Sequence, residues 1–250
     1  MQISLTGKVA LVTGSATGIG RAIAEALAAS GAAVALNHFG QADAVASVAA
    51  GIAMTGAVTA TYDADVTDAH AVAVMVAQIE ATLGPIDILV NNAGILLERP
   101  FLYIAEAEWD RVIAVDLKSV FLCTQAVLRQ MVGRGTGCII NIASELAYLG
   151  RAKFTAYCAA KAGVVGLTKS LAREFAPAIR INGIAPGPTE TAMLSLDLIS
   201  AAVRAKELAI PAARAAAPAE IAATAVFLAS DHARFYYGQM LSPNGGALMT

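Results

Sequence analysis

Residues 8–20 read Lys-Val-Ala-Leu-Val-Thr-Gly-Ser-Ala-Thr-Gly-Ile-Gly, and an Ala-rich stretch over residues 21–30 follows them. The β-branched run at 8–13 is typical of a buried parallel strand, and residues 21–30 fit a helix. Glycines between a strand and a helix let the backbone approach a phosphate, and the helix N-terminus offers it free N–H groups and a positive dipole end. A plain βα turn is the simpler alternative, but three glycines in this setting favour a dinucleotide-binding turn in an α/β fold.

Further apolar runs predict the remaining elements of the fold. We expect strands at residues 33–37, 58–62, 86–90, 138–143, 180–185 and 240–241. We expect helices over 106–131, from around residue 157 to about 175, and over 218–230. Residues 194–217 are rich in Ala and Leu without a strand pattern, so we predict that they are helical and mobile, within a substrate lid at about 188–217. The absence of an internal repeat or linker favours a single domain over residues 1–250.

The composition excludes several classes of function. The chain has 250 residues, of which 57% are hydrophobic and 14% charged, and its net charge of -2 argues against nucleic acid or an anionic membrane as the main partner. Its cysteines, Cys123, Cys138 and Cys158, are odd in number and form no C-x-x-C pair, which fits a reducing, cytoplasmic compartment. The sequence carries no metal-ligand motif, so we predict no catalytic metal.

One span requires a membrane check. Residues 44–62 carry no charge and are long enough to cross a bilayer, but they are mostly Ala and include Gly51 and Gly56. We interpret the span as a helix, a turn at Gly56 and a buried strand. The N-terminus lacks the basic and apolar regions of a secretory signal.

Polar and small residues follow several predicted strands. Asp65-Val66 comes after the strand at 58–62, Asn91-Asn92-Ala93-Gly94 ends the strand at 86–90, and Ser144 follows the strand at 138–143. Ligands of open parallel sheets lie outside these carboxyl ends. The Asn-Ala-Gly stretch taken alone fits a turn equally well, and Ser144 alone fits a cap or turn serine.

Tyr157 and Lys161 are four residues apart on a predicted helix, so both side chains lie on one face. A fixed ammonium favours the phenolate and lowers the tyrosine pKa, which makes Tyr157 a candidate general acid or base. Such a pair also arises by chance on a helix surface, so the spacing alone is weak.

The choice between NAD and NADP stays open in the sequence. An acidic residue near the end of the second strand holds a ribose hydroxyl, whereas an Arg there accommodates a 2′-phosphate. Here the chain reads Asn37-His38-Phe39, which supplies neither. His38 binds a phosphate only weakly because its ordinary pKa lies below 7, and a solvated loop histidine is the simpler interpretation.

Taken together, these motifs resemble the short-chain dehydrogenase/reductase family over about residues 8–246. The matching motifs are Thr13-Gly14-x-x-x-Gly18-Ile19-Gly20, Asp65-Val66, Asn91-Asn92-Ala93-Gly94, Ser144, Tyr157-x-x-x-Lys161, Pro186-Gly187, Pro218-x-Glu220-Ile221-Ala222 and Phe227-Leu228-Ala229-Ser230. The resemblance implies a doubly wound parallel sheet of about seven strands, a Rossmann fold with helices on both faces. It also implies NAD or NADP as the cofactor and the interconversion of a small alcohol and a carbonyl compound.

The resemblance also implies roles for individual residues. Ser144 would polarise the substrate carbonyl, Tyr157 would exchange its proton, and Lys161 would bind the nicotinamide ribose and lower the Tyr157 pKa. Thr189 would hold the nicotinamide carboxamide, and Asp65 would reach the adenine. The remaining cofactor contacts are expected at Gly14, Ser15, Thr17, Gly18, Ile19, Gly20, Asn37, His38, Val66, Asn91, Ala93, Gly94, Pro186 and Gly187.

Asp116 departs from the family pattern, in which many members carry Asn whose backbone carbonyl serves a proton relay. The backbone role can survive this change, but a buried carboxylate needs a partner or a raised pKa, and Lys161 could be that partner. We expect Asp116 in the catalytic group, with turnover kept or improved in Asp116→Asn.

The substrate is not determined by these motifs, because loops decide it. Pocket residues are expected at Leu96, Glu145, Leu146, Leu149, Phe154, Pro186 and Met193, with Arg151 as a further polar group. A hydroxy-sugar, a small ketone, a 3-oxoacyl thioester and a steroid all fit. Two alternative functions are a catalytically silent regulator that binds the cofactor, and an epimerase or dehydratase. The presence of Ser144, Tyr157 and Lys161 disfavours the regulator. The spacing of the glycines in the first turn disfavours the epimerase or dehydratase. Relatives in the family imply a homotetramer or homodimer.

Overall fold

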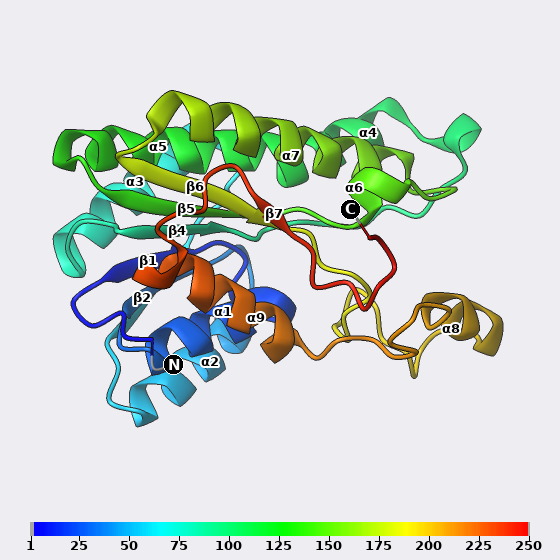
Figure 1. Ribbon diagram of the computed structural model, residues 1–250, viewed down its shortest axis with the longest axis horizontal. Coiled ribbons are helices and arrows are strands. Elements are labelled where there is room, and N and C mark those ends of the chain that lie inside the picture. The colour runs from blue at the N-terminus through cyan, green and yellow to red at the C-terminus, as the bar shows by residue number, and fades with distance from the viewer. Residues whose placement is uncertain (1–2, 250) are drawn as a thin grey trace.

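The computed structural model describes residues 3–249 and contains a seven-stranded parallel sheet in the order β3-β2-β1-β4-β5-β6-β7 (Figure 1). The strands are β1 (Val9–Val12), β2 (Ala33–His38), β3 (Thr59–Asp63), β4 (Ile88–Asn91), β5 (Gly137–Ile142), β6 (Ile179–Ile184) and β7 (Met240–Leu241). Every predicted strand is present, with ends within about two residues of the expectation. The strand order reverses between β1 and β4, which confirms the doubly wound fold and places its crevice at their carboxyl ends.

Helices cover both faces of the sheet (Figure 1). One face carries α1 (Gly18–Ala29), α2 (Ala42–Met54) and α9 (Pro218–Ala229), and the other α3 (Ala69–Thr82), α4 (Glu106–Ile113), α5 (Ser119–Arg134) and α7 (Thr155–Phe175). The shorter elements are η1 (Phe101–Tyr103), η2 (Ala114–Lys118), α6 (Leu146–Leu149), α8 (Ala201–Glu207) and η3 (Asp231–Ala233).

Both faces of β1 are buried, which explains its continuous apolar run. Ala10 and Val12 belong to the core that includes α1 and α9, whereas Val9 and Leu11 belong to the core that includes α3 and α5. Neighbouring residues of a strand point to opposite faces, so a strand covered on both sides needs apolar residues at every position.

The predicted helix over 106–131 is interrupted. Between α4 and α5 the chain forms a π-helical turn, η2, and this turn contains Asp116. The Asp116 carboxylate accepts a hydrogen bond from the Ile95 backbone N–H at 2.8 Å, and this contact with the segment after β4 lies where the helix widens. Apolar periodicity alone does not distinguish such a turn from regular helix, and π turns are frequent at functional sites.

The segment predicted to be helical over 194–217 is helical only in α8. Ser200 caps the start of α8 by accepting a hydrogen bond from the Val203 N–H at 3.3 Å. Pro211 follows shortly after its end and cannot continue a helix, because it lacks an N–H group. The rest of this segment forms turns and isolated bridges, so the prediction of a longer helix was wrong.

The uncharged span at 44–62 forms most of α2, a turn at Gly56 with φ of +82°, and β3, as interpreted from the sequence. The expectation that this strand is buried was wrong, because β3 lies at the edge of the sheet and only Tyr62 of its residues is buried. No helix among residues 3–249 is both long and apolar enough to cross a membrane.

Candidate active site

A cavity of about 790 Å³ lies at the carboxyl ends of the strands. Of the predicted site residues, all but Ser15, His38 and Asn91 line it. Its size is typical of a site for a small ligand or cofactor.

The glycine-rich turn forms one side of the cavity. A Cβ atom at Gly20 would lie 2.3 Å from the Gly14 carbonyl oxygen and 2.4 Å from Asn92 Nδ2, so only glycine fits here. The Thr17 side chain does not cap α1, and the first turn contains no acidic residue. The first-turn N–H groups of α1 are therefore left without a side-chain partner beside the cavity, which fits the pyrophosphate of a dinucleotide.

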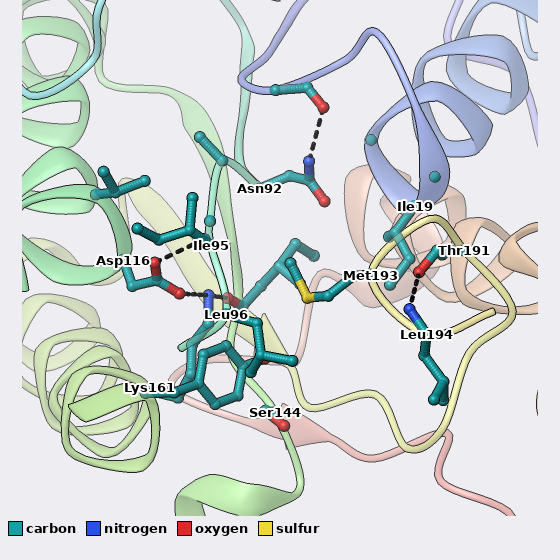
Figure 2. Close-up of a pocket in the computed structure, with 18 of the residues that line it drawn as sticks. Ile19, Asn92, Ile95, Leu96, Asp116, Ser144, Lys161, Thr191, Met193 and Leu194 are labelled. Carbon is teal, nitrogen blue, oxygen red and sulfur yellow. Dashed lines mark hydrogen bonds and ion pairs between the residues drawn. The ribbon is translucent and has the colours of Figure 1, made fainter. Parts of the chain in front are cut away.

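A hydrogen-bond network joins the end of β1 to the end of β4. Thr13 Oγ1 accepts from the backbone N–H groups of Asn92 and Ala93 at 3.0 and 3.1 Å. Asn92 Nδ2 donates to the backbone carbonyl oxygens of Thr13 and Gly14 at 3.0 and 3.1 Å (Figure 2). The sequence did not indicate a role for Asn92, although it stands within the Asn-Asn-Ala-Gly motif that marks this edge.

Asn37 lines the cavity, but its amide is already engaged. Its Oδ1 accepts from the Gly14 N–H at 3.3 Å, and its Nδ2 donates to the Ala64 carbonyl at 3.0 Å. His38 is buried at the end of β2 and its Nδ1 accepts from the Gln41 N–H at 3.3 Å, so the solvated-loop interpretation was wrong. Because the His38 side chain does not line the cavity, the structure does not place it for a cofactor contact.

Ser15 and Asn91 also lie away from the cavity lining. The Ser15 hydroxyl donates to the Asn37 carbonyl at 3.0 Å. Asn91 Nδ2 donates to Thr124 Oγ1 at 3.0 Å and to Asn141 Oδ1 at 2.8 Å, inside the protein. Their side chains connect neighbouring segments and do not line the cavity.

Asp65 lines the cavity together with Val66. One of its carboxylate oxygens accepts from the backbone N–H of Thr67 at 2.8 Å and from the Thr67 hydroxyl at 2.7 Å. These bonds fix the carboxylate at the end of β3 while its other oxygen takes part in no hydrogen bond within residues 3–249.

Ser144, Tyr157, Lys161 and Asp116 gather in the same cavity. The helix α7 carries Tyr157 and Lys161 one turn apart, and the Lys161 ammonium lies 5.6 Å from the centre of the Tyr157 ring. Lys161 Nζ donates to the Ile142 carbonyl at 3.1 Å and lies 3.3 Å from Asp116 Oδ2 (Figure 2). The lysine is therefore held in one position between two acceptors.

The buried charges of this group shift each other's protonation. Burial raises the pKa of Asp116, against the opposing effect of Lys161. Burial acts to lower the pKa of Lys161, but Asp116 and Tyr157 outweigh it and raise that pKa above its ordinary value. This direction keeps the ammonium of Lys161 protonated beside the phenol.

The pKa of Tyr157 is raised, contrary to the simple expectation from its spacing to Lys161. Burial is the largest cause, and the negative charge of Asp116 adds to it, while Lys161 and Ser144 act to lower the pKa. The predicted influence of the lysine is present, but desolvation outweighs it in the protein without ligand.

The substrate side of the cavity is lined by residues from several loops. These include Leu96, Glu145, Leu146, Phe154, Pro186 and Met193, as expected, and Met193 extends into the cavity (Figure 2). Leu149 does not line the cavity and is half exposed, because the short helix α6 turns it outward. Arg151 lines the cavity and is ion-paired with Glu207 of α8, a residue that was not anticipated.

Among residues 3–249 no group of three His, Cys, Asp or Glu side chains is placed to hold a metal ion.

The chain is similar to known proteins over nearly its whole length. Residues 8–197 match the family model described as short chain dehydrogenase. The chain is 41% identical over 244 residues to the 3-oxoacyl-(acyl-carrier-protein) reductase FabG of Staphylococcus aureus, with 97% of this chain and 98% of the relative covered.

Two solved structures are also similar to this chain. A protein from Beutenbergia cavernae named as an NAD(P)-dependent gluconate 5-dehydrogenase, with NADP at low occupancy, has a TM-score of 0.91 and 38% identity over 98% of each chain. A protein from Agrobacterium tumefaciens named as a gluconate dehydrogenase has a TM-score of 0.94 and 34% identity over 100% of each chain. The chain therefore belongs to the short-chain dehydrogenase/reductase family.

Proposed function

We propose that this NAD(P)-dependent oxidoreductase interconverts a secondary alcohol and a ketone, with Tyr157 as the general acid and base. The observation that carries the proposal is the meeting of Ser144, Tyr157 and Lys161 with the glycine-rich turn on one cavity. A regulator that only binds the cofactor would not need this set of side chains in contact with its ligand cavity.

The chemistry divides between cofactor and protein. The bound nicotinamide supplies or accepts the hydride. Ser144 and Tyr157 offer hydroxyl groups to the substrate oxygen, where negative charge develops during reduction. Tyr157 gives its proton to that oxygen, or takes one from the alcohol in the reverse direction. The fixed ammonium of Lys161 stabilises the phenolate that forms.

The same cavity offers groups for the whole length of a dinucleotide. The first turn of α1 would hold the pyrophosphate, Asp65 the adenine end and Lys161 the nicotinamide ribose. Thr189, which is buried and donates to the Gly187 carbonyl at 3.0 Å, would bind the carboxamide. The end of β2 presents neither an acidic residue nor an Arg to the cavity, so we leave both NAD and NADP as candidates.

Two substrate classes follow from the similar proteins. The relative named as a 3-oxoacyl reductase suggests a 3-oxoacyl thioester, and the two structures named as gluconate dehydrogenases suggest a polyhydroxylated compound. Glu145 on the substrate side favours the polyhydroxylated class, because its buried Oε2 makes no hydrogen bond among residues 3–249 and an acyl chain cannot supply one.

The test is transfer of label from cofactor to product. NADH and NADPH carrying deuterium at the reactive position should be offered with acetoacetyl thioester, alkyl ketones and ketoses. We expect deuterium on the new carbinol carbon of at least one product. Cofactor binding without label transfer to any of these carbonyl compounds would contradict the proposal and favour a regulatory protein.

We also propose a cytoplasmic homodimer or homotetramer. The cysteines Cys123, Cys138 and Cys158 are free. Phe101, Leu102 and Tyr103 of η1 are exposed apolar side chains next to one another, as at many interfaces between subunits.

A further inference from the structure

Three charged side chains form a wall on the substrate side of the cavity. Glu145 follows Ser144 directly, Arg151 follows α6, and Glu207 ends α8. Glu145 is 7% exposed and Glu207 is 8% exposed, which is unusual for carboxylates. We call these three residues the polar wall.

Arg151 already has its partners within the protein. Its guanidinium is ion-paired with Glu207 and lies 4.7 Å above the centre of the Phe154 ring. The pair neutralises both charges and connects α8 to the loop before α7. The charge of Arg151 is therefore balanced by Glu207, which weakens its attraction for an anionic group of a substrate.

Glu145 is left without a partner. Its Oε2 atom is buried and makes no hydrogen bond in the part of the chain that the structure describes. Its backbone is fixed, since its N–H donates to the Pro186 carbonyl at 3.0 Å. Burial, reinforced by the charge of Glu207, raises the pKa of Glu145 to about 7. Burying a carboxyl group without a hydrogen bond costs free energy, so binding is favoured for a ligand that supplies the missing hydrogen bond.

The surrounding charges select the chemistry of that ligand. Arg151 and Glu207 balance each other's charge, so Glu145 sets the charge of the polar wall. Its ionised form repels an anion, and its neutral form has no charge to hold a cation. A hydroxyl group both donates and accepts hydrogen bonds, so it suits the carboxyl group of Glu145 in either protonation state. We propose that Glu145 binds a hydroxyl group of the substrate beside the carbon that Ser144 and Tyr157 address, and that the cavity thereby selects polyhydroxylated substrates over alkyl ketones and acyl thioesters. This inference rests on the proposed oxidoreductase function.

The polar wall also assigns a positioning role to the segment around α8. Glu207 holds the Arg151 side chain, and Glu145 is the carboxyl group of the wall that lacks a hydrogen-bond partner among residues 3–249. Substrate specificity would therefore depend on Glu207 of the proposed lid, because Glu207 holds Arg151 in the polar wall.

The experiment compares hydroxylated and deoxy substrates of equal chain length. L-erythrulose with 2-butanone, D-fructose with 2-hexanone, and acetoacetyl thioester are assayed with the preferred cofactor, for the wild type, Glu145→Leu and Glu145→Gln. Binding of D-fructose and 2-hexanone to the enzyme–cofactor complex is measured in parallel by calorimetry. Glu98→Gln is the matched control, because Glu98 lines the same cavity but is exposed and paired with Lys153 at 3.7 Å.

We expect the wild type to prefer the hydroxylated member of each pair in kcat/KM. Glu145→Leu should lower that preference about tenfold to hundredfold, because it removes the only hydrogen-bonding group assigned to the hydroxyl. Glu145→Gln should retain most of it, since an amide also donates and accepts, and Glu98→Gln should leave the ratio unchanged. Calorimetry should rank the proteins in the same order by their preference for binding D-fructose over 2-hexanone.

The outcomes separate the two proposals. Turnover of alkyl ketones or acetoacetyl thioester at least as fast as that of the ketoses would overturn the role of Glu145 and leave the oxidoreductase function intact. The same holds if Glu145→Leu keeps the wild-type preference with an unchanged melting temperature. Absence of turnover on every compound would count against both proposals.

Discussion

Asp116 places a carboxylate 3.3 Å from the ammonium of Lys161, in a site where the lysine also faces Tyr157. This carboxylate raises the pKa of Lys161 and adds to the raised pKa of Tyr157. The residue thus stabilises the charged lysine but works against formation of the phenolate. Its two effects on the proposed proton transfer have opposite signs.

Asp116→Asn should keep kcat within about tenfold of the wild type. The amide oxygen can still accept from the Ile95 N–H, while loss of the negative charge lowers the pKa of Tyr157 and of Lys161. The pH profile of alcohol oxidation should therefore move to lower pH. Profiles of kcat for both proteins test this, and a loss of turnover beyond tenfold with an unmoved profile would contradict it.

Glu145 should make the folded protein less stable as the pH rises. Its pKa is raised from an ordinary 4.5 to about 7, so its contribution is fully present below pH 4.5 and is lost as the pH rises through about 7. The loss is on the order of 2–3 kcal/mol. Glu145→Gln cannot ionise, so its free energy of unfolding relative to the wild type should increase between pH 5 and pH 8.

Denaturant unfolding at several pH values measures that difference. The control is Glu98→Gln, which removes an exposed carboxylate from the lining of the same cavity. A difference between Glu145→Gln and the wild type that stays constant with pH would mean that Glu145 ionises in the folded protein as it does in the unfolded chain.

Sequence reasoning at the residue scale works where a motif is local. Tyr157 and Lys161 share a helix face by their spacing, and Ser144 stands directly after a strand, so their meeting in one cavity was predictable. Glu207 lies far along the chain from Arg151, and no local pattern indicates that they pair. The burial of His38 was missed for the same reason, since its surroundings come from tertiary packing.

At the scale of elements, the junction of β1 and α1 depends on close contacts of the backbone. Gly20→Ala would bring a Cβ atom to 2.3 Å from the Gly14 carbonyl oxygen, so the turn would have to move. We expect a cost of about 1–3 kcal/mol in stability and cofactor binding at least about tenfold weaker. Cofactor titration and thermal unfolding measure both effects.

Gly133→Ala is the matched control, because Gly133 lies in α5 with nothing within 4 Å of an added Cβ atom. This substitution should leave cofactor binding unchanged. Unaltered binding in Gly20→Ala would mean that the turn does not need its close approach, and would contradict the assignment of the pyrophosphate site.

The elements were predictable to different degrees. The strands β1, β2, β4, β5 and β6 are buried and form short apolar runs, which is why they could be located from the sequence. The strands β3 and β7 were also located, although they lie at the edges of the sheet and are less buried. The π turn η2 was not located, because apolar periodicity does not distinguish it from a regular helix and its contact, Asp116 with the backbone of Ile95, is tertiary. The extent of α8 was overestimated because Ala-rich composition favours helix while Ser200 and Pro211 limit it.

At the scale of the whole molecule, we expect self-association. Phe101, Leu102 and Tyr103 are 65%, 88% and 73% exposed, an apolar group that a monomer would leave in water. Sedimentation equilibrium at micromolar concentration should give the mass of a dimer or tetramer. A mass of one chain, 25.5 kDa, would contradict the expectation.

The central claim, that Tyr157 is the proton donor, can be tested with one variant. The doubly wound topology gathers residues from separate strands and helices on one cavity, and Tyr157 is the proposed proton donor among them. Tyr157→Phe removes the hydroxyl group and keeps the ring that packs beside Lys161. The measurement is turnover and reduced-cofactor binding of this variant beside the wild type, on a carbonyl compound that the wild type reduces.

We predict that Tyr157→Phe binds the cofactor within a few-fold of the wild type and loses at least about a hundredfold in kcat. Turnover within tenfold of the wild type, with binding unchanged, would show that the proton comes from another group and would contradict the account.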